Sequence, residues 1–164
     1  MSYRNLKILR SRFFYSAVEC PEGWMDATIV SYHLGCLKFV LDESHSWGDA
    51  YRYCRQRDSH LVEFYSTTEI HYVMAELRAI ESILGMTKNY WVGGTDWGSE
   101  GKWYMPNFLK SWPNTSSSYE WAEGEPNQGL EGNYMCLIAS ADYQAADCNE
   151  QEMHSFICQQ QEYI

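Results

Sequence analysis

Glu125, Pro126 and Asn127 form the stretch of the chain best suited to binding a ligand through oxygen atoms. A carboxylate and an amide carbonyl lie two residues apart, and both are the hard oxygen donors that Ca²⁺ takes. A cis bond before the proline, which occurs at roughly one X-Pro bond in twenty, would turn both side chains to the same side. The amide N–H and a carboxylate oxygen would then be available to a hydroxyl group. Because Glu-Pro-Asn is also an ordinary surface turn, the rest of the chain has to support this interpretation.

Six cysteines, an even number, indicate a disulfide-bonded protein. None of them forms a Cys-x-x-Cys pair or lies near a histidine at metal-site spacing, so zinc and redox centres are disfavoured. We therefore expect three disulfides and an oxidising compartment, which means a secreted, extracellular protein. The sequence alone permits about fifteen connectivities.

The charge is unevenly distributed along the 164 residues, whose formal net charge is −10. Basic residues precede the first acidic residue, Glu19, and the remainder of the chain is strongly acidic. An acidic surface repels phosphate backbones, so we expect no nucleic acid partner, whereas such a surface suits cations. No stretch is apolar for long enough to form a transmembrane segment. The first residues carry too many charges for a signal-peptide core, so we infer that a signal was removed.

The length suits a single domain with a hydrophobic core. We assign residues 20–164 to this domain and residues 1–19 to a basic N-terminal extension. Leu6, Leu9 and Phe13 recur in the extension at helix-like spacing. The extension could pack on the domain, mediate self-association or contact a membrane surface, although a partly ordered terminus is the simplest interpretation.

Two capped helices are predicted before the loop. Ser46-Trp47-Gly48-Asp49 and Ser66-Thr67-Thr68-Glu69 have the form of capping boxes, each followed by apolar residues at helical spacing. Gly85 is expected to end the second helix. The run 105–133 has little periodicity, and a loop of that length inside a compact domain is usually functional. Short strands are predicted at residues 20–24, 35–40, 60–64, 90–94, 102–104, 134–138 and 155–158.

The chain carries further motifs around these elements: Cys20-Pro21-x-Gly23-Trp24, Trp91-Val92-Gly93-Gly94, Asp96 followed by Glu100-Gly101-x-Trp103, and Trp121 before Gly124-Glu125-Pro126-Asn127. Together with the capped helices and the cysteine spacing, they resemble the C-type lectin-like domain family in its long form, over about residues 20–158. The resemblance implies an α+β fold with two helices, short antiparallel sheets and a long ligand-binding loop. It also implies three disulfides, Cys20–Cys36, Cys54–Cys158 and Cys136–Cys148.

The resemblance further implies a ligand site in the long loop. In sugar-binding members, a Glu-Pro-Asn loop marks mannose-type selectivity, and Ca²⁺ is held by that Glu and Asn, a further acid and an Asn-Asp pair. Two neighbouring hydroxyl groups of the sugar complete the shell of the ion. Glu125 and Asn127 match the first two ligands, and Glu131 is the expected third ligand.

The chain departs from the family pattern just before its fifth cysteine, where the family's Trp-Asn-Asp is replaced by Tyr143-Gln144-Ala145. Tyr143 can replace the Trp as a core residue, and Gln144 can offer an amide oxygen from a longer side chain. Ala145 has no side-chain ligand. Asp142 or Asp147 could turn in to replace the missing acid, although nothing in the spacing requires it.

A second, structural Ca²⁺ site of the family uses an acid pair that Asp96 and Glu100 match. Its other ligands would fall at Gln128 and Met135, which carry no carboxylate. Ca²⁺ takes roughly six to eight oxygen ligands, and its affinity depends on their number and charge. We therefore expect Ca²⁺ binding to be weak or absent.

The expected function is that of a secreted lectin that binds mannose-type or related glycans, or glycoproteins, through Glu125, Asn127, Glu131 and Gln144. The alternative is a Ca²⁺-independent domain that recognises a protein, a surface or a mineral through the same loops. Sensitivity of binding to a chelator distinguishes the two. An enzyme is not expected, because the five histidines form no sequence cluster and no nucleophile elbow or phosphate loop occurs.

Aromatic residues near the loop could stack on sugar faces or pack in the core; they are Trp97, Trp112, Tyr119 and Tyr134. Asn114 begins an Asn-Thr-Ser sequon for N-glycosylation, which agrees with secretion.

Overall fold

The computed structural model of the protein describes residues 19–112 and 120–161. The predicted basic extension, apart from Glu19, and the residues Asn114 and Tyr119 lie outside the described part. The helices are α2 (Trp47–Arg55) and α3 (Thr67–Leu84), with short 3-10 helices η2 (Gly129–Glu131) and η3 (Ala139–Ala141). The strands are β1 (Met25–Asp26), β2 (Cys36–His45), β3 (His60–Leu61), β4 (Tyr90–Thr95), β5 (Tyr104–Met105), β6 (Lys110–Ser111), β7 (Tyr134–Ile138), β8 (Gln144–Cys148) and β9 (His154–Gln160). Along the described residues, neither helix combines the length and the apolar character needed to cross a bilayer.

The two predicted helices are present, and two of their predicted end signals are confirmed. Ser46 is the N-cap of α2, and its hydroxyl accepts the Asp49 N–H at 3.3 Å. Gly85 ends α3 with a φ of 64°, a left-handed conformation that glycine adopts without a steric penalty.

The capping box predicted at the start of α3 is wrong. Ser66 occupies the N-cap position, but its side chain makes no capping hydrogen bond. Glu69 is buried, and its carboxylate accepts from the Tyr65 N–H at 2.5 Å and from the Ser31 hydroxyl. Because a buried carboxylate needs hydrogen-bond partners, Glu69 bonds to these groups instead of reaching back to the N-cap N–H of Ser66.

The strands form one connected sheet, in which β1, β2, β9, β4, β5 and β6 are neighbours in that order. β7 pairs with β4 and with β8, which brings the last hairpin against the centre of the sheet. Each pairing is antiparallel except that of β4 with β9, which is parallel. The run 105–133 is less irregular than predicted, because β6 pairs with β5 and η2 forms near its end.

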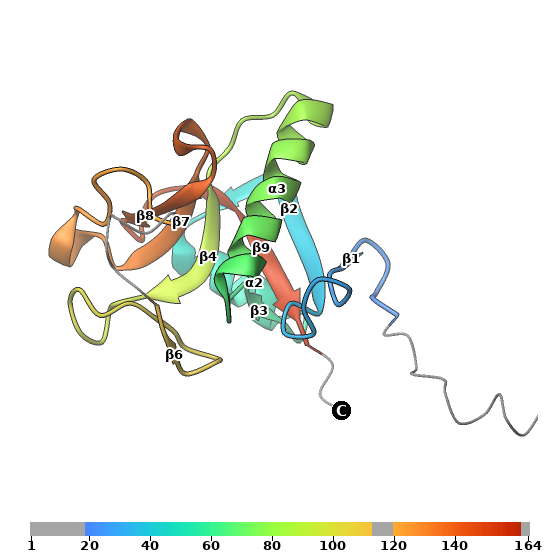
Figure 1. Cartoon of the computed structure of the whole chain (residues 1–164), viewed down its shortest axis with the longest axis horizontal. Helices are drawn as coiled ribbons and strands as arrows, with labels where there is room; N and C mark the ends of the chain where they lie inside the picture. Colours follow the sequence, from blue (N-terminus) through green and yellow to red (C-terminus); the bar gives the residue numbers. More distant parts are fainter. Residues whose placement is uncertain (1–18, 113–119, 162–164) are drawn as a thin grey trace, which may run out of the picture.

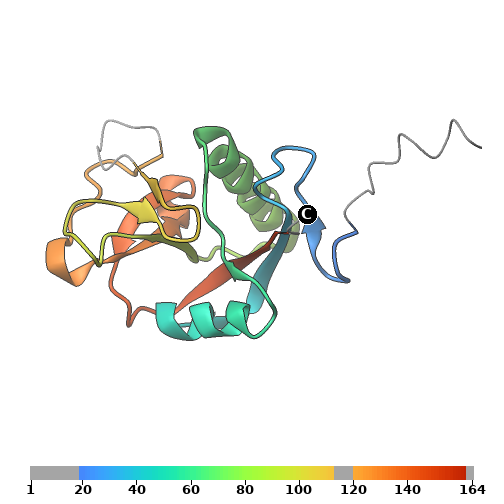
Figure 2. The same ribbon diagram turned by 90° about the horizontal axis from the view of Figure 1, so that it is seen from below.

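The helices α2 and α3 lie on opposite faces of the strands β2 and β9, as Figure 1 and Figure 2 show from two directions. Strands β4, β7 and β8 extend the sheet away from β1, and η2 lies at the end of the molecule farthest from β1 (Figure 1). The loop that carries Glu125 therefore belongs to the end opposite the first described residues.

All three implied disulfides are present. Cys20–Cys36 joins the first described segment to β2, and Cys54–Cys158 joins α2 to β9, each with a Cα–Cα distance of 5.5 Å. Cys136–Cys148 joins β7 to β8 with a Cα–Cα distance of 6.0 Å. All three distances lie in the usual range for disulfides. The third bridge holds together the hairpin on which the candidate site is built.

Candidate functional site

The segment before Glu125 is attached to β8 by main-chain hydrogen bonds. The Ala145 N–H donates to the Glu120 carbonyl at 2.7 Å, and the Ala122 N–H donates to the Ala145 carbonyl at 2.9 Å. Between these bonds the buried ring of Trp121 packs edge to face on Trp103, with a centroid distance of 5.1 Å. The binding loop thus starts from a rigid strand, as functional loops commonly do.

Glu125 and Asn127 face the same side of the loop and contact each other. The Glu125-Pro126 peptide bond is cis, and the Asn127 Nδ2 donates to the Glu125 Oε1 at 2.8 Å. The Glu125 Oε2 is buried and has no hydrogen-bond partner among the described residues. The structure therefore brings the first two predicted ligand residues together.

Asp147 supports this loop from β8, and sequence reasoning did not select it. Its side chain is 2% exposed, and its carboxylate accepts the Asn127 N–H at 2.8 Å and the Gln128 N–H. Asp147 lies two positions after Ala145, so both residues point to the same face of the strand. That alternation is the signal that could have identified it.

A pocket of about 360 Å³ lies beside the loop, and we call it the acidic pocket. Asp96, 2% exposed, accepts the Gly101 N–H at 2.8 Å through its Oδ2, while its Oδ1 is buried without a partner in the described part of the chain. Glu100, which the sequence paired with Asp96, lines the same pocket. The residues that line the acidic pocket are Asp96, Glu100, Gly101, Trp103, Pro126, Asn127, Gly129 and Asp147.

The carboxyl groups here oppose one another's ionisation. Desolvation, followed by a hydrogen bond with Asp147 and the charge of Asp147, raises the pKa of Glu125 to about 7. Burial, and to a lesser extent Asp147, raises the pKa of Asp96. Desolvation, then the charges of Asp96 and Asp147, also raises the pKa of Glu100. Asp147 is the common neighbour, so a cation near it would relieve repulsion in the whole group.

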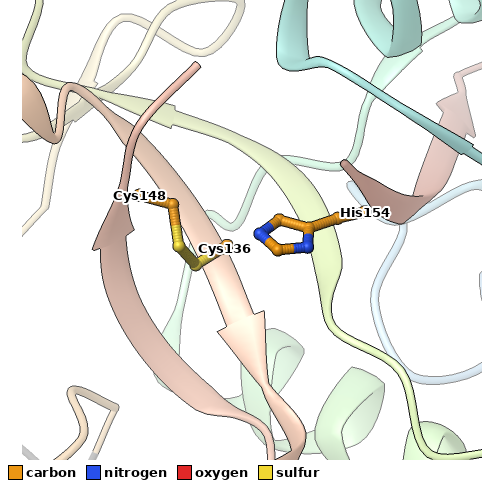
Figure 3. Close-up of side chains that lie close together, drawn as sticks. All are labelled: Cys136, Cys148 and His154. Carbon is orange, nitrogen blue, oxygen red and sulfur yellow. A yellow bond between two sulfur atoms is a disulfide. The ribbon is translucent and has the colours of Figure 1, made fainter. Parts of the chain in front are cut away.

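The oxygen donors fit a weakly held Ca²⁺ better than a tightly held one. Ca²⁺ prefers carboxylate and amide oxygens, and Glu125, Asn127 and Asp147 supply them. In residues 19–112 and 120–161, however, the only three Cys, His, Asp or Glu ligand atoms that lie within 4.8 Å of one another come from Cys136, Cys148 and His154 (Figure 3). The two sulfur atoms of that group form a disulfide, so they provide no thiolate ligand.

Two of the predicted ligand residues lie elsewhere in the structure. Glu131, in η2, lines a different pocket together with Trp97 and Asn133. Gln144, at the start of β8, donates through its Nε2 to the Trp121 carbonyl at 3.3 Å.

The substitutions in the family pattern have the structural roles that their side chains suggest. Tyr143 is a buried core residue, and its hydroxyl donates to the Glu81 carboxylate at 2.6 Å. Ala145 and Met135 are fully buried among the apolar core residues. Met135 is packed closely under Gly94, where an added Cβ would lie 2.9 Å from its Cε. These residues contribute packing and no ligand oxygen from their side chains.

The predicted stacking residues divide into two kinds. Trp112 is 5% exposed and belongs to the core. Trp97 is 72% exposed, and Tyr134 stacks on Trp47 with a centroid distance of 4.2 Å.

Two helices on a connected sheet, three disulfides and a cis Glu-Pro loop define a C-type lectin-like domain. The sequence matches the family described as Lectin C-type domain over residues 43–160, and the chain belongs to this family.

Individual relatives agree with this assignment. The chain is 29% identical to a perlucin-like protein of Mytilus galloprovincialis over 147 residues, which cover 86% of this chain and 83% of the relative. Among solved structures, the mouse scavenger receptor C-type lectin carbohydrate-recognition domain is similar with a TM-score of 0.67, 25% identity and coverage of 88% and 99%. A calcium-independent type II antifreeze protein shares the fold with a TM-score of 0.65, 22% identity and coverage of 88% and 95%.

Proposed function

We propose that the chain is a secreted carbohydrate-binding module that recognises mannose-type or related glycans through Glu125, Pro126 and Asn127. One observation carries the proposal: the Glu125 carboxylate and the Asn127 amide contact each other on one side of a loop with a cis Glu-Pro bond. This donor pair is the one that the resemblance to sugar-binding lectins implies. Secretion is supported by the three disulfides, which persist in oxidising compartments.

In this proposal Glu125, Asn127 and Asp147 would hold a Ca²⁺ ion, which would supply a positive centre for the oxygens of two neighbouring hydroxyl groups. The Glu125 Oε1, which accepts from the Asn127 Nδ2 in the free loop, accepts the hydrogen of a sugar hydroxyl. The Asn127 Nδ2, which donates to Glu125 in the free loop, donates to a sugar oxygen. Asp147 keeps the loop in place through the two main-chain N–H groups it accepts.

We expect the ion to be held weakly for three reasons. Ala145 offers no side-chain oxygen, and Gln144, whose Nε2 donates to the Trp121 carbonyl, has an amide in place of a charged carboxylate. A proton competes for Glu125, because its pKa is raised to about 7 by desolvation and by Asp147. Fewer ligands and less negative charge both lower the affinity of Ca²⁺ sites.

Binding to a surface coated with a mannose polymer tests the proposal. In Ca²⁺, wild-type protein should bind, and a chelator or Glu125→Gln should reduce binding several-fold. Glu123→Gln is the matched control, because this exposed acid lies two residues earlier and makes no contribution to the proposed ligand set. Undiminished binding by Glu125→Gln would contradict the proposal.

A second candidate function is metal-independent recognition of a protein, a surface or a mineral through the same loops. It is favoured by Ala145 and Met135, which leave both Ca²⁺ sites of the family pattern without side-chain ligands at these positions. The similar antifreeze protein, described as calcium-independent, provides a case of this fold without that requirement. Binding to such a partner that survives both the chelator and Glu125→Gln would support this function over the first.

A further inference from the structure

We propose that a second site, separate from the Glu125 loop, binds an uncharged oligosaccharide without a metal ion. The site is a groove of two adjoining cavities, which we call the aromatic groove, and rings of Trp47, Tyr51, Trp97, Tyr104 and Tyr134 line the first cavity. Glu125, Asn127 and Asp147 line neither cavity, so the proposal does not depend on a Ca²⁺ ion held by them or on the function proposed above.

The aromatic groove joins two cavities. The first, of about 310 Å³, contains the five rings, and the second, of about 330 Å³, lies beside it toward η2. Trp97 and Tyr134 line both cavities, so these two rings stand where the cavities meet. Each volume lies at the lower end of the range for small-molecule sites, which suits about one sugar ring per cavity.

The floor of the groove is held rigidly before any ligand arrives. The Trp47 ring stacks on Tyr134 at 4.2 Å and on Tyr51 at 5.4 Å, and its Nε1 donates to the Val92 carbonyl at 3.1 Å. These rings come from α2 and β7, two elements that pack on the central strand β4 or its neighbours. A stacked, hydrogen-bonded surface loses little freedom on binding, which favours affinity.

Trp97 is the exposed part of the groove. Its side chain is 72% exposed, although its main chain is fixed by the Trp97 N–H, which donates to the Thr95 Oγ1 at 3.1 Å. The Thr95 hydroxyl in turn donates to the Asn133 carbonyl at 2.6 Å. A large indole that is presented to solvent from a fixed backbone is a suitable stacking surface for a ligand.

The second cavity adds polar groups around these rings. Asn133, Asn149 and Gln151 bring side-chain amides, and Glu131 and Glu150 bring carboxylates. The C–H face of a sugar can pack on an aromatic face while its hydroxyl groups bond to surrounding amides and carboxylates. This combination of aromatic walls and a few polar groups is typical of small-molecule sites.

The negative charge around the groove favours uncharged saccharides over anionic ones. Two carboxylates line the second cavity, and the chain carries a formal net charge of −10. Sulfated or uronic-acid polymers would be repelled from such a surface. We therefore assign an uncharged chain of at least two sugar units, with one unit on each side of Trp97.

The test is a titration of the protein with uncharged di- and tetrasaccharides of glucose and of mannose in the presence of a chelator. Binding is measured by calorimetry and by tryptophan fluorescence. Wild-type protein should bind at least one of them, the tetrasaccharide more tightly. Trp97→Ala should weaken that binding by about tenfold, the equivalent of one aromatic stacking contact. Ile83→Ala is the matched control, because Ile83 is 79% exposed on α3 and outside the groove, and it should bind as wild type does.

Glu125→Gln separates this site from the loop site. It should leave binding in the chelator unchanged, while Trp97→Ala should leave the Ca²⁺-dependent part of mannose binding unchanged. Near-ultraviolet circular dichroism identifies any variant that fails to fold, and Trp97→Phe, which keeps a stacking ring, should retain most of the affinity. No binding of any uncharged saccharide in the chelator, equal binding by Trp97→Ala, or binding only of sulfated saccharides or of a proline-rich peptide would overturn the proposal.

Discussion

At the scale of single residues, the site is governed by two carboxyl groups that are close together and partly removed from water. Asp147 accepts two main-chain N–H groups and is fully surrounded, whereas Glu125 keeps one oxygen without a partner in the described structure. Such a pair resists double ionisation, so a proton or a cation must compensate the charge. In the proposed site, a proton and Ca²⁺ would therefore compete for Glu125.

This competition predicts an unusual pH dependence of stability in the absence of Ca²⁺. The folded protein keeps a proton on Glu125 up to its raised pKa of about 7, whereas the unfolded chain releases it near the ordinary value of 4.5. Between these values the folded state binds more protons, so the free energy of unfolding contributed by Glu125 falls as pH rises. Urea unfolding across this window should show the fall in wild type, and Glu125→Gln should reduce it.

Glu123→Gln serves as the control for that series, since the exposed Glu123 has no part in the pair. Added Ca²⁺ should stabilise wild type more at high pH than at low pH, because it binds the ionised carboxylate. If the free energy of unfolding of wild type and of Glu125→Gln changes equally with pH in this range, the description of Glu125 and Asp147 as a coupled pair is contradicted.

A second prediction at this scale concerns Asp147. In Asp147→Asn one oxygen can still accept a main-chain N–H, but the new NH₂ group faces the other donor. We expect urea unfolding to report a loss of about 1–3 kcal/mol, the usual penalty for an unsatisfied buried group. The pKa of Glu125 should fall, because the charge and hydrogen bond of Asp147 that raise it are removed. Unchanged stability together with an unchanged pH profile would show that Asp147 does not support the loop.

At the scale of elements, the cross-links determine which parts can stay irregular. Cys54–Cys158 joins residues 104 positions apart and fastens α2 to β9, while Cys20–Cys36 spans only 16 positions. In the chain-entropy model, the longer loop loses more freedom in the unfolded state when it is closed. The long binding region lies within the larger of the two loops.

Removing these bridges separately tests that difference. The paired variant Cys54→Ala, Cys158→Ala should lose roughly 4–5 kcal/mol of unfolding free energy in urea, against about 3 kcal/mol for Cys20→Ala, Cys36→Ala. The Cys20→Ala, Cys36→Ala variant is the control for the effect of losing any disulfide. Equal losses would show that loop length does not govern their contributions.

Helices and strands could be predicted where local residue chemistry determines where they begin and end, and less well where tertiary contacts determine it. The N-cap of α2 and the C-cap at Gly85 follow from side-chain and backbone properties of the residues themselves. Glu69 does not form the capping box that its position in sequence predicts, because Ser31 and Tyr65, outside the helix, supply its hydrogen-bond partners. A strand was predicted at residues 102–104, and β5 begins at its last residue, whereas the two residues of β6 are too few to produce a visible alternation.

At the scale of the whole molecule, the candidate site and the aromatic groove lie next to each other. Asp96 lines the acidic pocket, and the next residue, Trp97, lines the aromatic groove. Likewise, Gly129 lines the acidic pocket and Leu130 lines the aromatic groove. The acidic pocket therefore lies beside the aromatic groove. This arrangement would allow one glycan chain to contact both.

The site could be predicted from sequence only in part. Glu125 and Asn127 are two positions apart, and their geometry depends mainly on the proline between them. Asp147 is close to them only because β8 pairs with the segment around Trp121, a contact between residues far apart in the chain. Glu131 was selected by its distance in sequence, but η2 places it in the neighbouring pocket instead.

A calorimetric titration with Ca²⁺, made with and without mannose and repeated with Glu125→Gln, tests the central claim most directly. For wild type we expect weak binding, with a dissociation constant of about 10⁻⁴–10⁻³ M as in extracellular modules, that becomes tighter when mannose is present. Glu125→Gln should abolish the mannose-dependent part of the heat. A mannose-dependent heat that persists in Glu125→Gln, or its absence from wild type, would contradict glycan recognition through the Glu125-Pro126-Asn127 loop.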